Sequence, residues 1–320
     1  MRRAGSLPVL LATALLAPVA AVGAPSAGPS AHGRSRGRSG AFSGGSEAPH
    51  PAPTATHGVR YRVVGCRSRT GVAFRDGPAR REVAIGFDDG PAGDTEAFVR
   101  MLERNHARAT FFLVGVHVSS EYRRLLAREL RDGDALGDHT FTHPDLTRLP
   151  VRAVRGQLQG TLHVIRALSG YTPCVFRPPY GAYDPSVLQI AGSLGLATVL
   201  WNVDPSDWAE PPIQTIVRRV LEQVRPGSIV ISHDGGGPRE GTLAAYPRII
   251  AALRSRGYRI VTIPQLLGFR PVYVRCRRLC GTLGIPRAGL PRRAIVERTL
   301  SASPLRQRVF QLGTPSAEAA

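Results

Sequence analysis

Residues 83–89 have the sequence VAIGFDD, a short apolar run that ends at two adjacent acids, Asp88 and Asp89. A short apolar run of this kind is typical of a buried strand. Similar runs follow along the chain, and amphipathic stretches with helical spacing lie between them. Including the first, the expected strands cover residues 83–87, 109–115, 135–138, 174–177, 197–203, 228–232 and 259–263. Strands that alternate with helices predict parallel βαβ units.

The stretches between these strands predict helices. They cover residues 95–105, 120–131, 151–168, 185–194, 213–224 and 243–256. Seven parallel strands fit a barrel better than a short open sheet. The sequence therefore predicts an α/β fold, a (β/α) barrel of about seven parallel strands, within a domain at residues 58–270.

The N-terminal segment has the features of an export signal. Two arginines precede an apolar run over residues 7–21, and small residues follow it. We therefore expect residues 1–24 to be a cleaved signal peptide and the protein to be secreted, extracellular or cell-wall associated. An uncleaved membrane anchor is the alternative, although the run is short for a span. Residues 25–57 are rich in Ser, Gly, Pro and Arg and are expected to form a disordered linker.

The chain is strongly basic. Its 42 basic and 23 acidic residues give a formal net charge of +19 at pH 7, and every basic residue is an arginine. Such a chain attracts polyanions. Because no nucleic-acid motif is present and only 6% of residues are aromatic, an anionic cell wall is favoured as partner over a membrane surface, and nucleic acid is not expected. The alternative is a general bias towards arginine that leaves a solvated basic surface. Residues 271–320 are expected to form a partly ordered Arg-rich tail.

Four cysteines, Cys66, Cys174, Cys276 and Cys280, fit an oxidising compartment. They allow three complete pairings, and the sequence does not choose among them. A bridge from Cys66 to Cys276 or Cys280 would tie the two ends of the predicted barrel together. A zinc site made of these cysteines is disfavoured because the CxxC spacing is absent.

Polar residues gather where five of the expected strands end. They are Asp88 and Asp89, His139 and His143, Arg177 and Tyr180, Asp204 with Asp207 and Trp208, and His233 with Asp234. The C-terminal strand ends of a parallel barrel open onto one face, where active sites lie. One such residue would carry little weight, but groups at five strand ends predict a shared site.

His139 and His143 are candidate metal ligands. On a helical turn, residues four apart share a face and can hold one ion. A carboxylate of Asp88 or Asp89 would complete a set that leaves positions open for water and substrate, as catalytic sites do. One divalent metal ion is therefore predicted. Zinc is the expected ion, and cobalt, nickel, manganese or iron could bind the same ligands.

Acid and base groups for hydrolysis are also present. Neighbouring side chains diverge, so one of Asp88 and Asp89 can bind the metal while the other accepts a proton. His233 is suited to protonate a leaving amine. Asp204 could orient His233 and raise its pKa, and Arg177 could orient the base and keep it ionised. A structural ion pair is the alternative for Arg177 and Asp204.

Five segments together resemble the five ordered motifs of the NodB-like polysaccharide deacetylases, the carbohydrate esterases of the fourth family. They are residues 86–91 (GFDDGP), 139–144 (HTFTHP), 177–181 (RPPYG), 204–208 (DPSDW) and 231–234 (ISHD). The resemblance covers roughly residues 80–265. Any one motif is weak, whereas five in the right order and spacing are specific.

The resemblance implies a distorted (β/α) barrel with one divalent metal, usually zinc. By motif match it implies that Asp88 is the general base, held by Arg177, and that the metal ligands are Asp89, His139 and His143. It also implies that the Tyr180 N–H donates to the oxyanion and that Asp204 tunes the catalytic acid, His233. The implied walls of the acetyl pocket are Trp208 and Ile231. For Trp208, simple core packing is an alternative. Gly86 stands where the family usually has Thr or a similar residue, and Ile231 where Leu is usual, but neither change removes a catalytic group.

The reaction that the resemblance implies is hydrolysis of an acetamide to an amine and acetate. N-acetylglucosamine units of peptidoglycan are the expected substrate, because an exported basic protein fits an anionic wall. Chitin or chito-oligosaccharides and acetylxylan are the alternatives. A non-catalytic wall-binding homologue is a further alternative, although the intact candidate ligands, acid and base argue against it.

Overall fold

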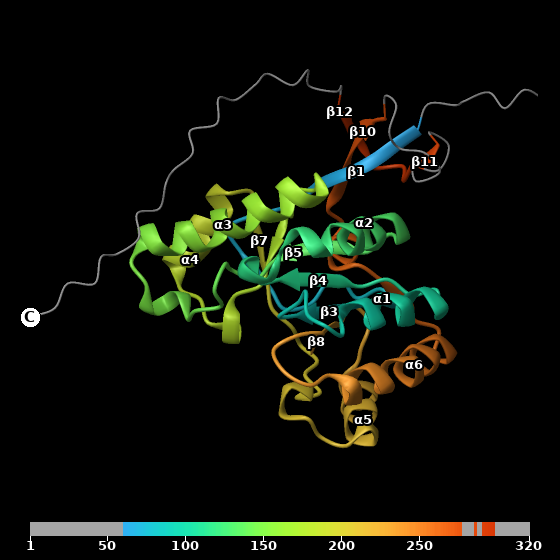
Figure 1. Ribbon diagram of the computed structural model, residues 1–320. Helices are drawn as coiled ribbons and strands as arrows, with labels where there is room; N and C mark the ends of the chain where they lie inside the picture. Colours follow the sequence, from blue (N-terminus) through green and yellow to red (C-terminus); the bar gives the residue numbers. More distant parts are fainter. Residues whose placement is uncertain (1–59, 277–284, 287–289, 298–320) are drawn as a thin grey trace, which may run out of the picture. The chain divides into compact units, whose positions relative to one another are not determined.

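The computed structural model describes residues 60–276, 285–286 and 290–297 (Figure 1). The predicted signal peptide at residues 1–24 and the predicted linker at residues 25–57 lie outside the described residues, as does most of the predicted tail. None of the helices among the described residues has the length and hydropathy of a transmembrane span.

A parallel sheet forms the centre of the fold. Its strands are β2 (Ala73–Phe74), β3 (Glu82–Asp88), β4 (Thr110–Leu113), β5 (Ala135–Asp138), β6 (Val175–Phe176), β7 (Ala197–Val199), β8 (Ile229–His233) and β9 (Arg259–Val261). The hydrogen-bonded order is β2-β7-β6-β5-β4-β3-β8, and β9 pairs with the first residues of β3. All these pairs are parallel, as the alternation of strands and helices predicts.

The sheet curls until its two sides meet. Val203, beyond the end of β7, forms a parallel bridge with Val230 in β8. The Ile231 N–H donates to the Val203 carbonyl at 3.0 Å, and the Val203 N–H donates to the Ile229 carbonyl at 3.2 Å. The predicted (β/α) barrel of about seven parallel strands is confirmed. It is distorted, because a short stretch closes it and β2 and β6 have only two residues each.

Helices cover the outside of the sheet (Figure 1). They are α1 (Thr95–Arg104), α2 (Arg123–Asp132), α3 (Val151–Ser169), α4 (Pro185–Ser193), α5 (Ile213–Gln223), α6 (Glu240–Ser255) and the one-turn α7 (Ile263–Leu266). Phe87 of β3 packs against Phe98 of α1, Phe111 of β4 and Tyr246 of α6, with ring centroids 4.8–5.5 Å apart. All four rings are fully buried. This packing fixes the strand whose last residue is Asp88.

A small second sheet joins the first and last described segments. Its strands, in spatial order, are β11 (Ile285–Pro286), β1 (Arg60–Arg67), β10 (Arg270–Arg275) and β12 (Ile295–Glu297). β1 and β10 pair antiparallel. The domain boundary expected after residue 270 thus falls inside β10, and the first residues of the expected tail belong to a strand. The β-branched and aromatic run VYV at residues 272–274 is the signal that could have found it.

The disulfide pairing differs from the one considered from the sequence. Cys66 is bonded to Cys174, with Cα atoms 5.3 Å apart, and not to Cys276 or Cys280. The position of this disulfide follows from main-chain contacts between β1 and the segment just before β6. Cys276 is also disulfide-bonded, and Cys280 lies outside the described residues. The bridge therefore ties the first strand to the middle of the barrel.

Candidate active site

The candidate site is a cavity of about 520 Å³ at the C-terminal ends of the parallel strands. Nine of the ten predicted site residues line it. They are Asp88, Asp89, His139, His143, Tyr180, Asp204, Trp208, Ile231 and His233. The tenth, Arg177, is fully buried and contacts Asp88. The fold therefore brings together residues that are far apart in the sequence.

Three side chains in the cavity are placed to hold one metal ion. Ligand atoms of Asp89, His139 and His143 all lie within 4.8 Å of one another. Asp89 Oδ1 is 3.5 Å from His139 Nε2 and 3.3 Å from His143 Nε2, yet this buried oxygen has no hydrogen-bond partner among the described residues. A buried acceptor without a donor is costly. A divalent cation shared with two imidazoles would satisfy it, so the residues present fit a metal.

The electrostatics of Asp89 and His143 favour the forms that bind metal. Burial raises the pKa of Asp89, but the neighbouring imidazoles of His139, His233 and His143 lower it by more, so the pKa lies below its usual range. Burial and the charge of His139 lower the pKa of His143. His139 Nδ1–H donates to the Arg177 carbonyl at 2.7 Å, which turns Nε2 towards Asp89. An ionised carboxylate and neutral imidazoles are the ligand forms.

The two histidines lie on a loop and not on the expected helical turn. Thr140 and His143 have left-handed backbones, with φ of 67° and 60°. Asp138 Oδ1 accepts from the Thr140 N–H at 2.8 Å, and Thr140 Oγ1 accepts from the His143 N–H at 3.0 Å. Gln157 Oε1 accepts from two more N–H groups of the loop, both at 2.8 Å. Side-chain acceptors thus replace helical hydrogen bonds and still bring the imidazoles together.

Asp88 is held by a buried arginine. Arg177 Nη1 donates to Asp88 Oδ1 at 2.7 Å, and the two side chains are 0% and 2% exposed. The guanidinium also lies over the Phe112 ring, 4.2 Å from its centroid. Gly86 leaves room for it, because a Cβ at that position would lie 2.6 Å from Nη1. The glycine that departs from the motif is therefore matched to the position of the arginine.

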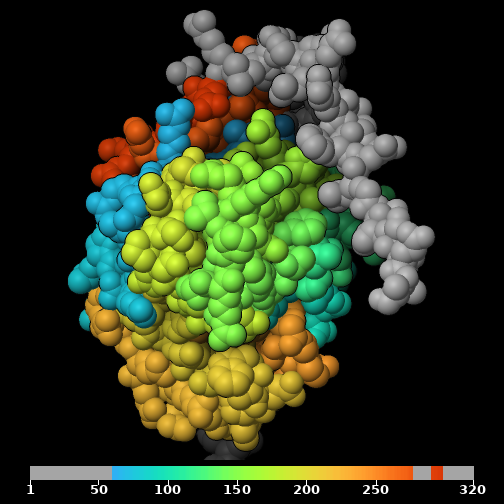
Figure 2. Space-filling view, turned by 90° about the vertical axis from the view of Figure 1, so that its left-hand side faces the viewer, coloured from blue at the N-terminus to red at the C-terminus, as the bar shows by residue number. Residues whose placement is uncertain are grey.

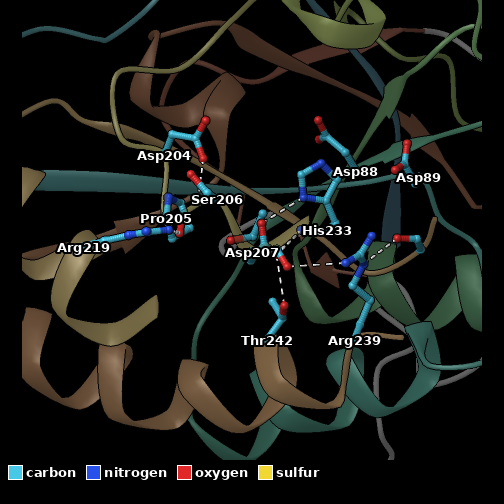
Figure 3. Close-up of polar contacts among 12 residues, drawn as sticks. Asp88, Asp89, Asp204, Pro205, Ser206, Asp207, Arg219, His233, Arg239 and Thr242 are labelled. Atoms are coloured by element: carbon cyan, nitrogen blue, oxygen red, sulfur yellow. Dashed lines mark hydrogen bonds and ion pairs between the residues drawn. The ribbon is translucent and has the colours of Figure 1, made fainter. Parts of the chain in front are cut away.

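His233 is held by Asp207 and not by Asp204 (Figure 3). His233 Nδ1 lies 2.9 Å from Asp207 Oδ1, and the His233 N–H donates to Asp207 Oδ2 at 2.9 Å. Asp204 Oδ1 instead accepts from the Ser206 N–H at 2.6 Å. The left-handed Ser206 (φ 53°) turns the chain so that the later aspartate enters the buried side of the site. The pairing predicted for Asp204 is therefore wrong, and Asp207 occupies that place.

Two residues that the sequence did not single out complete this network. Thr242, in the first turn of α6, donates through Oγ1 to Asp207 Oδ2 at 3.0 Å. Arg239, just before α6 and 3% exposed, donates through Nη1 to the Asp207 carbonyl at 3.4 Å. Burial lowers the pKa of His233, but the hydrogen bond with Asp207 and the nearby carboxylates raise it by more, so the pKa lies above its ordinary value.

Apolar side chains line part of the cavity. Ile231 is 5% exposed, Trp208 59% and Tyr180 72%. Trp208 is therefore not a core residue, and the alternative of simple core packing is wrong. The Tyr180 ring meets the His143 ring edge to face, with centroids 4.9 Å apart. Exposed apolar groups beside convergent polar ones are typical of a ligand-binding groove.

Several known proteins are similar to this chain in sequence and fold. The family model for polysaccharide deacetylases matches residues 75–199. A chitooligosaccharide deacetylase from Bradyrhizobium sp. (strain ANU 289) is 37% identical over 178 residues, 52% of this chain and 81% of that protein. A peptidoglycan-N-acetylglucosamine deacetylase from Bacillus cereus is 34% identical over 173 residues, 54% of this chain and 62% of that protein. The crystal structure of a peptidoglycan N-acetylglucosamine deacetylase matches with a TM-score of 0.59 at 34% identity, covering 62% of this chain and 94% of that one.

The barrel, its strand-end cavity and these similarities define a hydrolase that modifies carbohydrates. The chain belongs to the polysaccharide deacetylase family. It is thus an enzyme that removes acetyl groups from an acetylated polysaccharide, and it carries an Asp-His-His group that could bind a metal.

Proposed function

We propose that the protein is a zinc-dependent deacetylase of N-acetylglucosamine units in peptidoglycan. The observation that carries the proposal is that one cavity holds three kinds of group: a cluster of metal-binding donors, a carboxylate held by an arginine, and an imidazole held by an aspartate. Zinc is the proposed ion because two imidazoles and one carboxylate with open positions suit it; cobalt, nickel, manganese and iron suit the same donors.

The base of the proposed reaction is Asp88. A divalent metal held by Asp89, His139 and His143 would polarise the acetyl carbonyl and make a water molecule more acidic. Arg177 fixes one oxygen of Asp88, and the other lies 3.9 Å from His139 Nε2, on the side of the cluster. Asp88 is therefore placed to accept the proton of the attacking water.

The acid of the proposed reaction is His233. Because Asp207 raises its pKa, the imidazole stays protonated to higher pH and can donate a proton to the leaving nitrogen. The Tyr180 N–H is the proposed donor to the developing oxyanion. Trp208 and Ile231 are proposed to pack against the acetyl methyl, the apolar part of the reacting group.

Peptidoglycan is proposed as substrate on two grounds. The chain carries a formal charge of +19, which suits an anionic wall. A peptidoglycan N-acetylglucosamine deacetylase is also a structural neighbour at 34% identity. The 37% identity with a rhizobial chitooligosaccharide deacetylase favours chito-oligosaccharides as the second candidate. We also propose that residues 1–24 direct export and that the enzyme acts outside the cell.

Acetate release tests the function and the substrate together. We expect release from N-acetylated peptidoglycan to fall about 100-fold or more in chelator and to return with zinc. Chito-oligosaccharides and acetylxylan are the other substrates to be tested.

His143→Ala should remove both bound zinc and activity, whereas His163→Ala, which changes an exposed histidine of α3, should remove neither. Full activity after metal is removed would exclude the proposed metal dependence.

Asp207 and Asp204 form a matched pair for the pH dependence. Asp207→Asn removes the charge that raises the pKa of His233, so the acid form should be lost at lower pH. We expect kcat to fall about 100-fold and the alkaline limb of the pH profile of kcat to move to lower pH. Asp204→Asn keeps an acceptor for Ser206 and should change kcat less than about threefold. Equal effects of the two changes would contradict the assignment.

A further inference from the structure

A second cavity, of about 940 Å³, is larger than the active site and lies away from it. It lies where the ends of the small sheet meet the segments before β3 and after α7. Its lining includes six arginines and no acidic residue. The arginines are Arg67, Arg69, Arg80, Arg270, Arg292 and Arg293. We call this cavity the arginine groove.

Most of the charge in the arginine groove is not neutralised. Arg67 pairs with Glu297 at 3.1 Å and Arg80 with Glu82 at 2.9 Å. The other four arginines form no ion pair with the described residues. In Figure 2 the segment at residues 290–297 (red) lies close to the N-terminal strand (blue), as the Arg67–Glu297 pair requires. Guanidinium groups from four parts of the chain therefore line one cavity.

We propose that the arginine groove binds an extended polymer with repeated phosphodiester groups. A guanidinium presents a fork of N–H donors that matches two oxygens of one phosphate. A single phosphate would leave most of the 940 Å³ empty, whereas a chain of phosphates could meet the unpaired arginines in turn. Nucleic acid is disfavoured, because the one aromatic residue of the lining, Phe269, is 7% exposed and packs against Phe74.

The position of the groove leaves the active site open. Arg80 comes just before β3, and Asp88 is the last residue of that seven-residue strand. At the usual rise along a strand, β3 spans about 20 Å. A polymer in the groove would therefore hold the enzyme without blocking the cavity where the glycan is processed. Holding the enzyme near its glycan substrate is a role that rests on the proposed function, but binding of the polymer does not itself require catalysis.

Binding to labelled poly(glycerol phosphate) tests the proposal with the full chain. In the variant Arg270→Gln/Arg292→Gln/Arg293→Gln, we expect about 10-fold or greater weakening at low salt, measured by fluorescence anisotropy. The slope of log affinity against log salt should fall by about two, since each lost phosphate contact removes roughly 0.7–0.9. The control Arg124→Gln/Arg152→Gln/Arg166→Gln removes the same charge from exposed positions of α2 and α3 and should weaken binding less than about threefold.

Thermal unfolding and acetate release from chito-oligosaccharides should be unchanged in both triple variants, because the altered residues lie outside the cavity. If the two triple variants weaken polymer binding equally, net charge alone explains the binding and the proposal is overturned. Stronger groove-dependent binding to polyglutamate, single-stranded DNA or vesicles with 30% phosphatidylglycerol would also overturn it. If the wild-type chain binds the polymer but releases no acetate, the proposed polymer binding by the arginine groove is supported and the proposed deacetylase function is contradicted.

Discussion

Asp88→Asn should lower kcat about 1000-fold or more while the protein still binds one metal ion. Asparagine keeps the size of the side chain and an oxygen for Arg177, but its amide cannot accept the proton of the attacking water. The metal should remain, because its proposed ligands are Asp89, His139 and His143. The predicted phenotype is therefore an occupied but inactive site.

Three measurements separate this result from its alternatives. Acetate release gives kcat, metal analysis gives zinc per chain, and thermal unfolding shows that the variant is folded at the assay temperature. Asp76→Asn is the control, since Asp76 is an exposed carboxylate paired with Arg225; it should change kcat less than about twofold. Near-full activity of Asp88→Asn would remove Asp88 as the base, and loss of zinc would make it a ligand instead.

Arg177→Met should cause the largest loss of stability among the site variants. Arg177 is 0% exposed and Asp88 2%, so methionine leaves a buried carboxylate without its cation. Breaking a buried pair on one side typically costs about 3–5 kcal/mol. Urea unfolding should show this loss in the free energy of unfolding, and kcat should fall as well because Asp88 is no longer held in place.

The double variant Arg177→Met/Asp88→Asn tells the lost ion pair from lost packing. Removing both charges takes away the unpaired group, so the double variant should be more stable than Arg177→Met alone. The arginine also packs over Phe112, and that contact would be missing in both variants. Additive losses from the two changes would mean that packing, and not the uncompensated charge, sets the cost.

Much of the site could be predicted because barrel topology turns sequence position into spatial position. Apolar runs mark the strands, and the first polar residues after them must lie at one end of a parallel sheet. This logic placed Asp88, Asp89, His139 and His233 around one cavity. Arg177 could be predicted to meet Asp88 for the same reason, since β6 and β3 are parallel strands of one barrel and both residues lie at its C-terminal end.

Other features could not be predicted from position along the chain. Asp204 and Asp207 lie three residues apart after the same strand, and only the left-handed turn at Ser206 decides which one reaches His233. Thr242 and Arg239 join the network because the first turn of α6 and the residue before it lie against Asp207. Spacing alone also suggested a helix for the His139–His143 segment, whereas the acceptors on Asp138 and Gln157 hold a loop.

The barrel, the polar residues at its strand ends and the family can be inferred from the amino-acid sequence alone, because hydrophobic periodicity and motif order are local properties of the chain. The Cys66–Cys174 bridge, the Asp207–His233 pair and the arginine groove become visible only in the folded structure. Each of these three features depends on which segments, distant in the sequence, come into contact in the fold. Such meetings are set by packing of the whole core and by the need to satisfy buried polar groups, and neither can be read from residue spacing.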